Sequence, residues 1–152
     1  MTTSEPAAAS SSSPIVFTTT IADPPRTVWA ELTDNEVPRA WMWDTTVLSS
    51  WEPGHPYVMS SHGTALVIGE VLAVDWPHLL RLTFDARWDD ESSAEEAGEL
   101  EYVLEEVDAS STRLTVTITG GGPATHGSAA SDTPGIYTNL KSWMETGKVD
   151  AH

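Results

Sequence analysis

Apolar and polar residues alternate along one stretch near the middle of the chain. From residue 80 to residue 88, every second side chain is apolar and those between are polar or charged. A period of two is typical of a strand that has one face against a core. Residues 69–75 form a second, largely apolar run, and the sequence Asp-Trp-Pro-His at 75–78 is typical of a tight turn. This stretch therefore predicts an antiparallel hairpin.

Similar patterns, separated by turn signals, predict a run of further strands. Pro-Gly-His-Pro at 53–56, His-Gly at 62–63 and three glycines at 120–122 mark turns or strand ends. The acidic segment 89–98 has no apolar period and predicts a mobile loop. The predicted strands are residues 15–22, 45–52, 57–61, 64–75, 80–88, 99–107 and 112–119.

Three segments have helical signals. Asp23 is the expected N-cap of a helix that has a proline in its first turn and ends near residues 33–35. A short second helical piece is expected over residues 35–43. The last helix is expected over residues 134–146, where apolar side chains recur at helical spacing and Gly147 follows as C-cap. Strands followed by a closing helix predict an α+β fold, with that helix across one face of a curved antiparallel sheet.

The chain of 152 residues is long enough for one domain. We expect a disordered N-terminal tail at 1–13, the domain at 14–148 and a short C-terminal tail at 149–152. No cysteine is present, so disulfides and thiolate chemistry are excluded. The first residues have no basic and apolar segments of a secretory signal, and we expect a cytoplasmic protein.

The chain is strongly acidic, with a formal net charge of −16 at pH 7. Such a charge repels phosphate backbones and anionic lipid, which argues against nucleic-acid and membrane partners. Ten acidic residues fall within residues 89–108. A solvated surface, adaptation to high salt and a docking patch for a basic partner all fit this pattern.

Six segments, in order, resemble one known family. They are residues 22–29 (ADPPRTVW), 41–43 (WMW), 51–57 (WEPGHPY), 69–77 (GEVLAVDWP), 112–117 (TRLTVT) and 139–147 (NLKSWMETG). The chain resembles the START-like (SRPBCC) superfamily, in its branch named for the activator of the heat-shock-protein-90 ATPase. The resemblance implies the helix-grip fold, a curved antiparallel sheet of six to seven strands that wraps a C-terminal helix.

The resemblance also implies a cavity between sheet and helix. Superfamily members bind hydrophobic or aromatic small molecules there, and a minority catalyse cyclisation or dehydration. Relatives commonly pair, which implies a homodimer. The co-chaperone activity of the name-giving protein depends on a separate N-terminal domain, and we do not expect it here. Because the predicted last helix is short, the cavity is expected to have a more open mouth or a smaller volume.

Aromatic side chains are the candidate ligand-binding residues. A concave apolar wall suits a hydrophobic ligand, although the same aromatics could simply fill a core. The candidates are Trp43, Trp51, Tyr57, Phe84, Trp88, Tyr102, Tyr137 and Trp143.

No catalytic constellation is evident. The five histidines lack metal-ligand spacing, no serine has a GxSxG context and no phosphate-binding loop is present, so we expect neither metal nor cofactor. His55, beside the aromatic corner, and Glu70, which shares the parity of Leu72 and Val74, are the two catalytic candidates. Three functions stay open: binding a hydrophobic small molecule, a cyclase or hydrolase activity in the same cavity, and protein interaction through the acidic residues 89–106.

Overall fold

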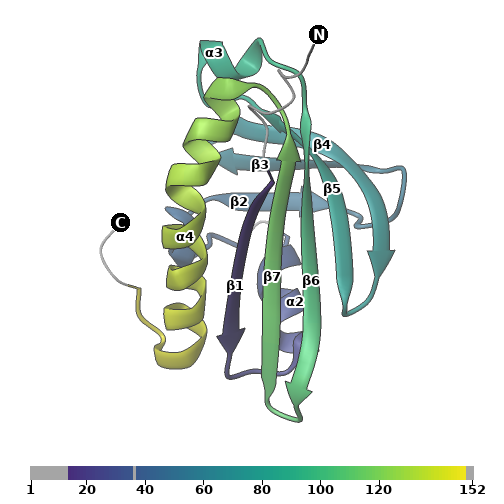
Figure 1. Cartoon of the computed structure of the whole chain (residues 1–152), viewed down its shortest axis with the longest axis vertical. Coiled ribbons are helices and arrows are strands. Elements are labelled where there is room, and N and C mark those ends of the chain that lie inside the picture. The colour runs from purple at the N-terminus through teal and green to yellow at the C-terminus, as the bar shows by residue number, and fades with distance from the viewer. Residues whose placement is uncertain (1–13, 36, 150–152) are drawn as a thin grey trace, which may run out of the picture.

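A seven-stranded antiparallel sheet forms the framework of the protein (Figure 1). The computed structural model describes residues 14–35 and 37–149. The spatial order is β1-β7-β6-β5-β4-β3-β2, and every neighbouring pair is antiparallel. The strands are β1 (Ile15–Ile21), β2 (Thr46–Ser49), β3 (Pro56–Ser61), β4 (Thr64–Asp75), β5 (Leu79–Ala86), β6 (Gly98–Asp108) and β7 (Ser111–Gly120).

The sheet curls, so that β2 and β3 run across the direction of β1 and β7 (Figure 1). The long helix α4 (Pro123–Thr146) packs along β1 and against the short 3-10 helix η1 (Ala40–Met42). Helix α2 (Pro25–Thr33) packs on β2, β6 and β7, and α3 (Asp90–Ser93) packs on α4. This arrangement confirms the predicted α+β helix-grip fold.

The core lies on the concave face of the sheet, as the alternation predicts. In β5 the side chains of Leu80, Leu82, Phe84 and Ala86 are buried, and those between are more exposed. Strands β6 and β7 repeat this pattern. The central hairpin is confirmed, because β4 ends at Asp75 and β5 begins at Leu79.

The predicted strand 45–52 is shorter in the structure, where β2 ends at Ser49. Asn35 accounts for this end: its side-chain amide donates to the Ser49 carbonyl and its oxygen accepts from the Ser49 N–H, at 2.9 and 3.0 Å. Trp51 has a φ of 59°, which strand geometry does not allow.

The two short helices expected after β1 are present, but the N-cap of the first and the length of the second differ from the expectation. Pro24, with extended φ and ψ, is the N-cap of α2, so Asp23 lies one position outside it. The predicted helix over residues 35–43 is reduced to η1. Hydrogen bonds between Arg39 and Thr45, and between Asp44 and Arg39, close the chain into a loop there, and Trp43 and Asp44 have positive φ.

The largest correction concerns α4, which begins at Pro123 and not at Pro134. Pro134 lies inside the helix. The N-terminus is capped by Glu95, whose carboxylate accepts from the backbone N–H of Ala124 and of Thr125, each at 2.8 Å. The reason given for a more open or smaller cavity, a short last helix, therefore does not hold.

The predicted loop 89–98 differs in the structure, because this segment contains the short helix α3 and the Glu95 cap. The side chain of Asp89 accepts from the Ser92 N–H at 2.7 Å and caps α3. At the C-terminal end, Val149 packs against the core. The predicted N-terminal tail, and residues 150–152 of the predicted C-terminal tail, lie outside the described residues.

Candidate ligand cavity between the sheet and the C-terminal helix

A cavity of about 290 Å³ lies between the concave face of the sheet and α4. Its sheet wall is largely apolar, and its other walls come from the loop after η1, the end of β5 and the N-terminal half of α4. The residues that line it are Met42, Trp43, Thr45, Met59, Leu66, Val67, Phe84, Trp88, Asp89, Leu100, Ile118, Ser128, Ala129, Asp132, Thr133, Ile136 and Tyr137.

The helix wall consists of Ser128, Ala129, Asp132, Thr133, Ile136 and Tyr137. Ala129, Thr133 and Tyr137 follow one another at every fourth position, so they share one face of α4, and all three are buried. Small side chains there leave space between helix and sheet. Tyr137 closes one end of the row.

Two aromatic rings stand together on the sheet wall. Phe84 and Trp88 meet edge to face, with their ring centroids 5.9 Å apart at an interplanar angle of 62°. This geometry is favourable for aromatic pairs, and both rings line the cavity. Two exposed carboxylates, Asp89 and Asp132, also line the cavity, and their exposure places them at its mouth.

A buried pair of hydroxyl groups adjoins the cavity at Tyr137. The phenol oxygens of Tyr102 and Tyr137 are 2.6 Å apart, and their rings meet edge to face at 5.9 Å. Burial raises the pKa of Tyr102, and it raises that of Tyr137 well above its usual value. Both groups therefore stay neutral and can donate or accept a hydrogen bond.

Arg39 is buried next to this pair, with 3% of its surface exposed. Its Nη2 donates to Met42 Sδ at 3.2 Å and to Thr45 Oγ1 at 3.1 Å, and its guanidinium lies 4.9 Å from the centre of the Trp41 ring. Burial lowers the pKa of Arg39. Within the part of the chain that the structure describes, no carboxylate lies within ion-pair distance of Arg39.

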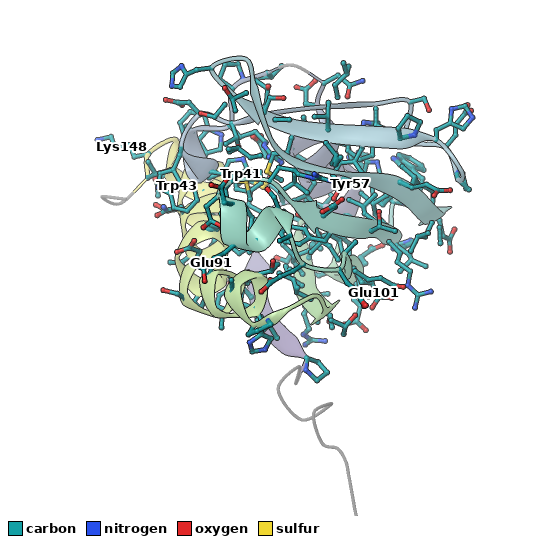
Figure 2. All side chains as sticks on the ribbon, turned by 90° about the horizontal axis from the view of Figure 1, so that it is seen from above. Trp41, Trp43, Tyr57, Glu91, Glu101 and Lys148 are labelled. Atoms are coloured by element: carbon teal, nitrogen blue, oxygen red, sulfur yellow. The ribbon has the colours of Figure 1, made fainter. Side chains whose placement is uncertain are left out.

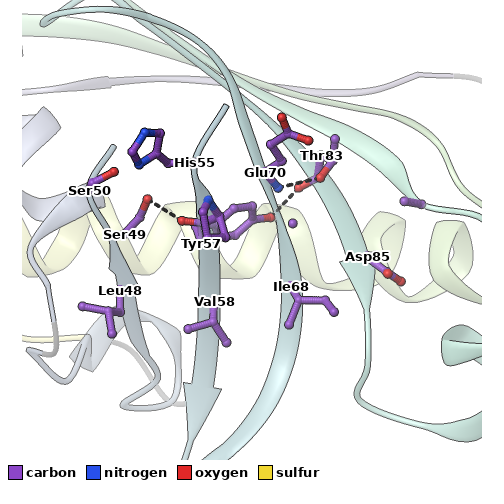
Figure 3. A pocket seen from close by; sticks show the side chains of 13 residues that line it. Leu48, Ser49, Ser50, His55, Tyr57, Val58, Ile68, Glu70, Thr83 and Asp85 are labelled. Atoms are coloured by element: carbon purple, nitrogen blue, oxygen red, sulfur yellow. Dashed lines mark hydrogen bonds between the residues drawn. The ribbon is translucent and has the colours of Figure 1, made fainter. Parts of the chain in front are cut away.

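A second, open hollow of about 910 Å³ lies on the outer face of the sheet (Figure 3). In the close-up, Leu48, Val58 and Ile68 lie in a row across neighbouring strands, with α4 behind the sheet. Tyr57 also contributes, and its hydroxyl donates to the Thr83 carbonyl at 2.6 Å. This hollow is distinct from the cavity under α4.

Residues 22–145 match the family described as Activator of Hsp90 ATPase homolog 1-like protein. The chain belongs to this family. Solved structures show the same fold at low identity. A protein from Mesorhizobium loti is 20% identical, with 90% of this chain and 100% of that chain covered and a TM-score of 0.73. The Aha1 dimer from Colwellia psychrerythraea is 17% identical, with 90% and 98% covered and a TM-score of 0.69.

An HSP90 activator from Plasmodium falciparum is 15% identical, with 84% of this chain and 92% of that chain covered and a TM-score of 0.65. No curated protein matches the chain. No helix in residues 14–35 and 37–149 of this family member is long and apolar enough to cross a membrane. Over the same described residues, no three His, Asp or Glu side chains gather as a metal site requires.

The structure brings four of the eight predicted aromatic residues together at the cavity of this family member. Trp43, Phe84, Trp88 and Tyr137 line it, and Tyr102 lies behind Tyr137. Trp43 was expected to face inward, but its positive φ turns the side chain toward solvent, where 48% of its surface is exposed. Figure 2 labels Trp43 together with the buried Trp41.

The other predicted aromatics lie elsewhere. Trp51 stacks on Tyr57 with ring centroids 6.3 Å apart, and Tyr57 lines the outer hollow. Trp143 packs partly buried against the core, further along α4. None of these three lines the cavity under α4.

Both catalytic candidates line the outer hollow instead of the cavity. The His55 ring is about half exposed, and its Nε2 lies 3.6 Å from Glu52. Glu70 is exposed, although Val74 of the same parity is partly buried. The reason is a register shift between Val71 and Ala73, which reverses the facing of the residues that follow.

Sequence reasoning missed Arg39, Trp41 and the polar residues of the helix wall. The wall had a usable signal, because Ala129, Thr133 and Tyr137 recur every four residues. Arg39 had none, because its loop has no period.

Proposed function

We propose that this family member binds a small hydrophobic or aromatic molecule in the cavity under α4. The single observation that carries the proposal is the cavity itself, a space with an apolar sheet wall and a paired aromatic corner at Phe84 and Trp88. Ligand sites are typically concave, mostly apolar and equipped with a few polar groups. Thr45, Thr133 and Tyr137 supply such groups here.

The volume limits the size of the ligand. Cavities that bind drug-sized molecules measure about 300–1,000 Å³, so a cavity of about 290 Å³ is at the lower end. A molecule with one or two rings suits it better than a sterol or a long acyl chain.

Binding is better supported than catalysis. Acid–base chemistry in an apolar cavity is typically carried out by a desolvated titratable group. Asp89 and Asp132 are the carboxylates in the lining, and both are exposed. The alternative of a protein-interaction module is weakened by the open cavity and by the use of Glu95 as a helix cap.

A pair of matched variants tests the proposal. Ala129 is buried and lines the cavity, whereas the adjacent Ala130 is exposed. Ala129→Leu adds three carbons to the cavity, and Ala130→Leu adds the same three to solvent. Calorimetric titration with neutral aromatics such as indole and 2-naphthol should show binding to the natural protein and to Ala130→Leu.

Binding to Ala129→Leu should be lost or strongly weakened. Circular dichroism should show both variants folded, since a side chain that fills empty space relieves the cost of a cavity. Equal binding by both variants would place the ligand elsewhere, and no binding by any of the three proteins would refute the proposal for this size of ligand.

Homodimer formation stays a prediction for this chain. It is supported by the Colwellia psychrerythraea relative, which was solved as a dimer. Sedimentation equilibrium should give about twice the chain mass of 16.4 kDa, and a value near 16.4 kDa would refute it.

A further inference from the structure

Arg39 carries a poorly satisfied charge beside the cavity, and the role inferred for it rests on the proposed function. An arginine side chain keeps its proton in proteins, so a buried arginine carries a charge into the interior. Buried charges are ordinarily paired with an opposite charge or fully hydrogen-bonded. Arg39 has neither, since its Nε has no hydrogen-bond partner in the part of the chain that the structure describes.

The acceptors that Arg39 does have are weak or shared. Met42 Sδ is a thioether, which is a poor acceptor. Thr45 Oγ1 also donates its own hydrogen to the Met42 carbonyl, at 2.8 Å. The charge of Glu31 acts to raise the pKa of Arg39, but the Oε2 of Glu31 accepts from the indole N–H of Trp41 at 3.0 Å.

The weakly satisfied nitrogens lie along one edge of the guanidinium. Nε and Nη2 point to the same side, and this edge is one that binds a carboxylate with two parallel hydrogen bonds. A purely structural role in holding the loop would be served by the backbone bonds between Arg39 and Thr45, which are present already. The hydrogen-bonding capacity of the buried Nε–Nη2 edge is not used by this role.

This edge lies directly behind the cavity wall. Both acceptors of Nη2, Met42 and Thr45, line the cavity, as does Tyr137. Methionine is unbranched and flexible, so its thioether can rotate away without moving the backbone. A ligand acceptor could then replace Met42 Sδ on Nη2 and also reach Nε.

We propose that the cavity is selective for amphipathic acids, with the apolar body of the ligand against Phe84 and Trp88 and its anionic group on the Nε–Nη2 edge of Arg39. The acidic mouth fits this orientation, because Asp89 and Asp132 repel an anion at the entrance and Arg39 attracts it at the inner end. The ligand class is an aromatic or short aliphatic carboxylic acid in its ionised form.

The test compares two ligands of the same shape, 2-naphthoate and 2-naphthamide, by calorimetric titration. The natural protein should bind the acid about tenfold more tightly or better, since hydrogen bonds between two charged groups exceed those to a neutral amide by that order. Arg39→Met should lose this preference and still bind 2-naphthamide. Arg26→Met makes the same change on the exposed face of α2 and should keep the preference.

A second readout needs no variant at position 39. In NMR spectra of arginine side chains, the Nε–H signal of Arg39 should move downfield with 2-naphthoate and stay in place with 2-naphthamide. Equal affinity for acid and amide, or an unmoved signal, would overturn the inference and leave the proposed function standing. Failure of 2-naphthol, acid and amide alike to bind would overturn both.

Discussion

Glu95 caps the N-terminus of α4 by accepting a hydrogen bond from the backbone N–H of Ala124, 29 residues further along the chain. Its other oxygen accepts from Thr125. The first N–H groups of a helix have no partners within the helix, and a carboxylate there also interacts favourably with the helix dipole. The acidic segment between β5 and β6 thus helps to build the helix wall of the cavity.

Removal of this cap should loosen the first half of α4. Glu95→Ala deletes both acceptors. Relative to the natural protein, we expect amide hydrogen exchange in this variant to become faster over residues 126–133 and to change less over residues 137–146. Glu96→Ala changes the adjacent, exposed carboxylate and is the control. Unchanged exchange over residues 126–133 in Glu95→Ala would show that packing alone holds that half of the helix.

The same contact predicts an acid-sensitive helix end. The N–H groups of Thr125 and Ala124 stabilise the carboxylate and hold the pKa of Glu95 below its usual value. A group with a lower pKa in the folded state stabilises the fold above its unfolded pKa, about 4.3 for Glu, and loses this as pH falls through the folded value. Protection of residues 126–133 should therefore decline below about pH 4.

In Glu95→Ala that protection should be low at neutral pH and should change little on acidification. The difference between the variant and the natural protein should accordingly shrink in acid. A constant difference from pH 7 to pH 3 would contradict the assignment of the effect to the Glu95 carboxylate.

The tyrosine pair predicts a non-additive pattern of stabilities. Tyr102→Phe or Tyr137→Phe removes one hydroxyl and leaves the other buried without this partner, at a cost of about 1–3 kcal/mol each. The double variant removes both groups and should cost less than the sum of the single changes. Urea denaturation of the four proteins measures this coupling. Additive losses would show that the two hydroxyls do not interact.

Much of the fold could be predicted because its signals are local. Leu80, Leu82 and Phe84 point to one face in any strand, so alternation alone predicts β5 and its buried side. The N-terminal half of α4 is different. Gly127, Pro134 and Gly135 all disfavour a helix interior, and the cap that compensates comes from Glu95, which no local pattern connects to the helix.

The residues of the candidate site also differ in whether a local sequence pattern predicts them. Phe84 and Trp88 were predicted at the cavity because strand parity places them there. Glu70 was misplaced because a single register shift in β4 reverses parity, and such shifts leave no mark in composition. Arg39 could not be predicted as a site residue, because an arginine in a loop is ordinarily exposed and only the structure shows that this one is buried.

Gly69 lies at a close approach between β4 and β5 beside the outer hollow, and a substitution there tests this packing. A Cβ at this position would lie 2.5 Å from the Thr83 carbonyl oxygen and 2.6 Å from Tyr57 Cε1. Since the carbonyl is backbone, it cannot move aside, and Gly69→Ala should destabilise the protein by about 1–3 kcal/mol or more in urea denaturation.

Gly135→Ala is the matched control for Gly69→Ala. Nothing lies within 4 Å of the added carbon, and the position is inside α4, so this change should stabilise by about 0.5–1 kcal/mol. Equal effects of the two substitutions would contradict the close approach at Gly69.

The most direct test of ligand binding under α4 is to locate a bound molecule by nuclear Overhauser effects. With 2-naphthol added to the natural protein, ring protons should show contacts to the methyl groups of Met42, Ala129 and Ile136, which line the cavity. Contacts instead to the methyl groups of Leu48, Val58 and Ile68 would place the ligand in the outer hollow and contradict the account.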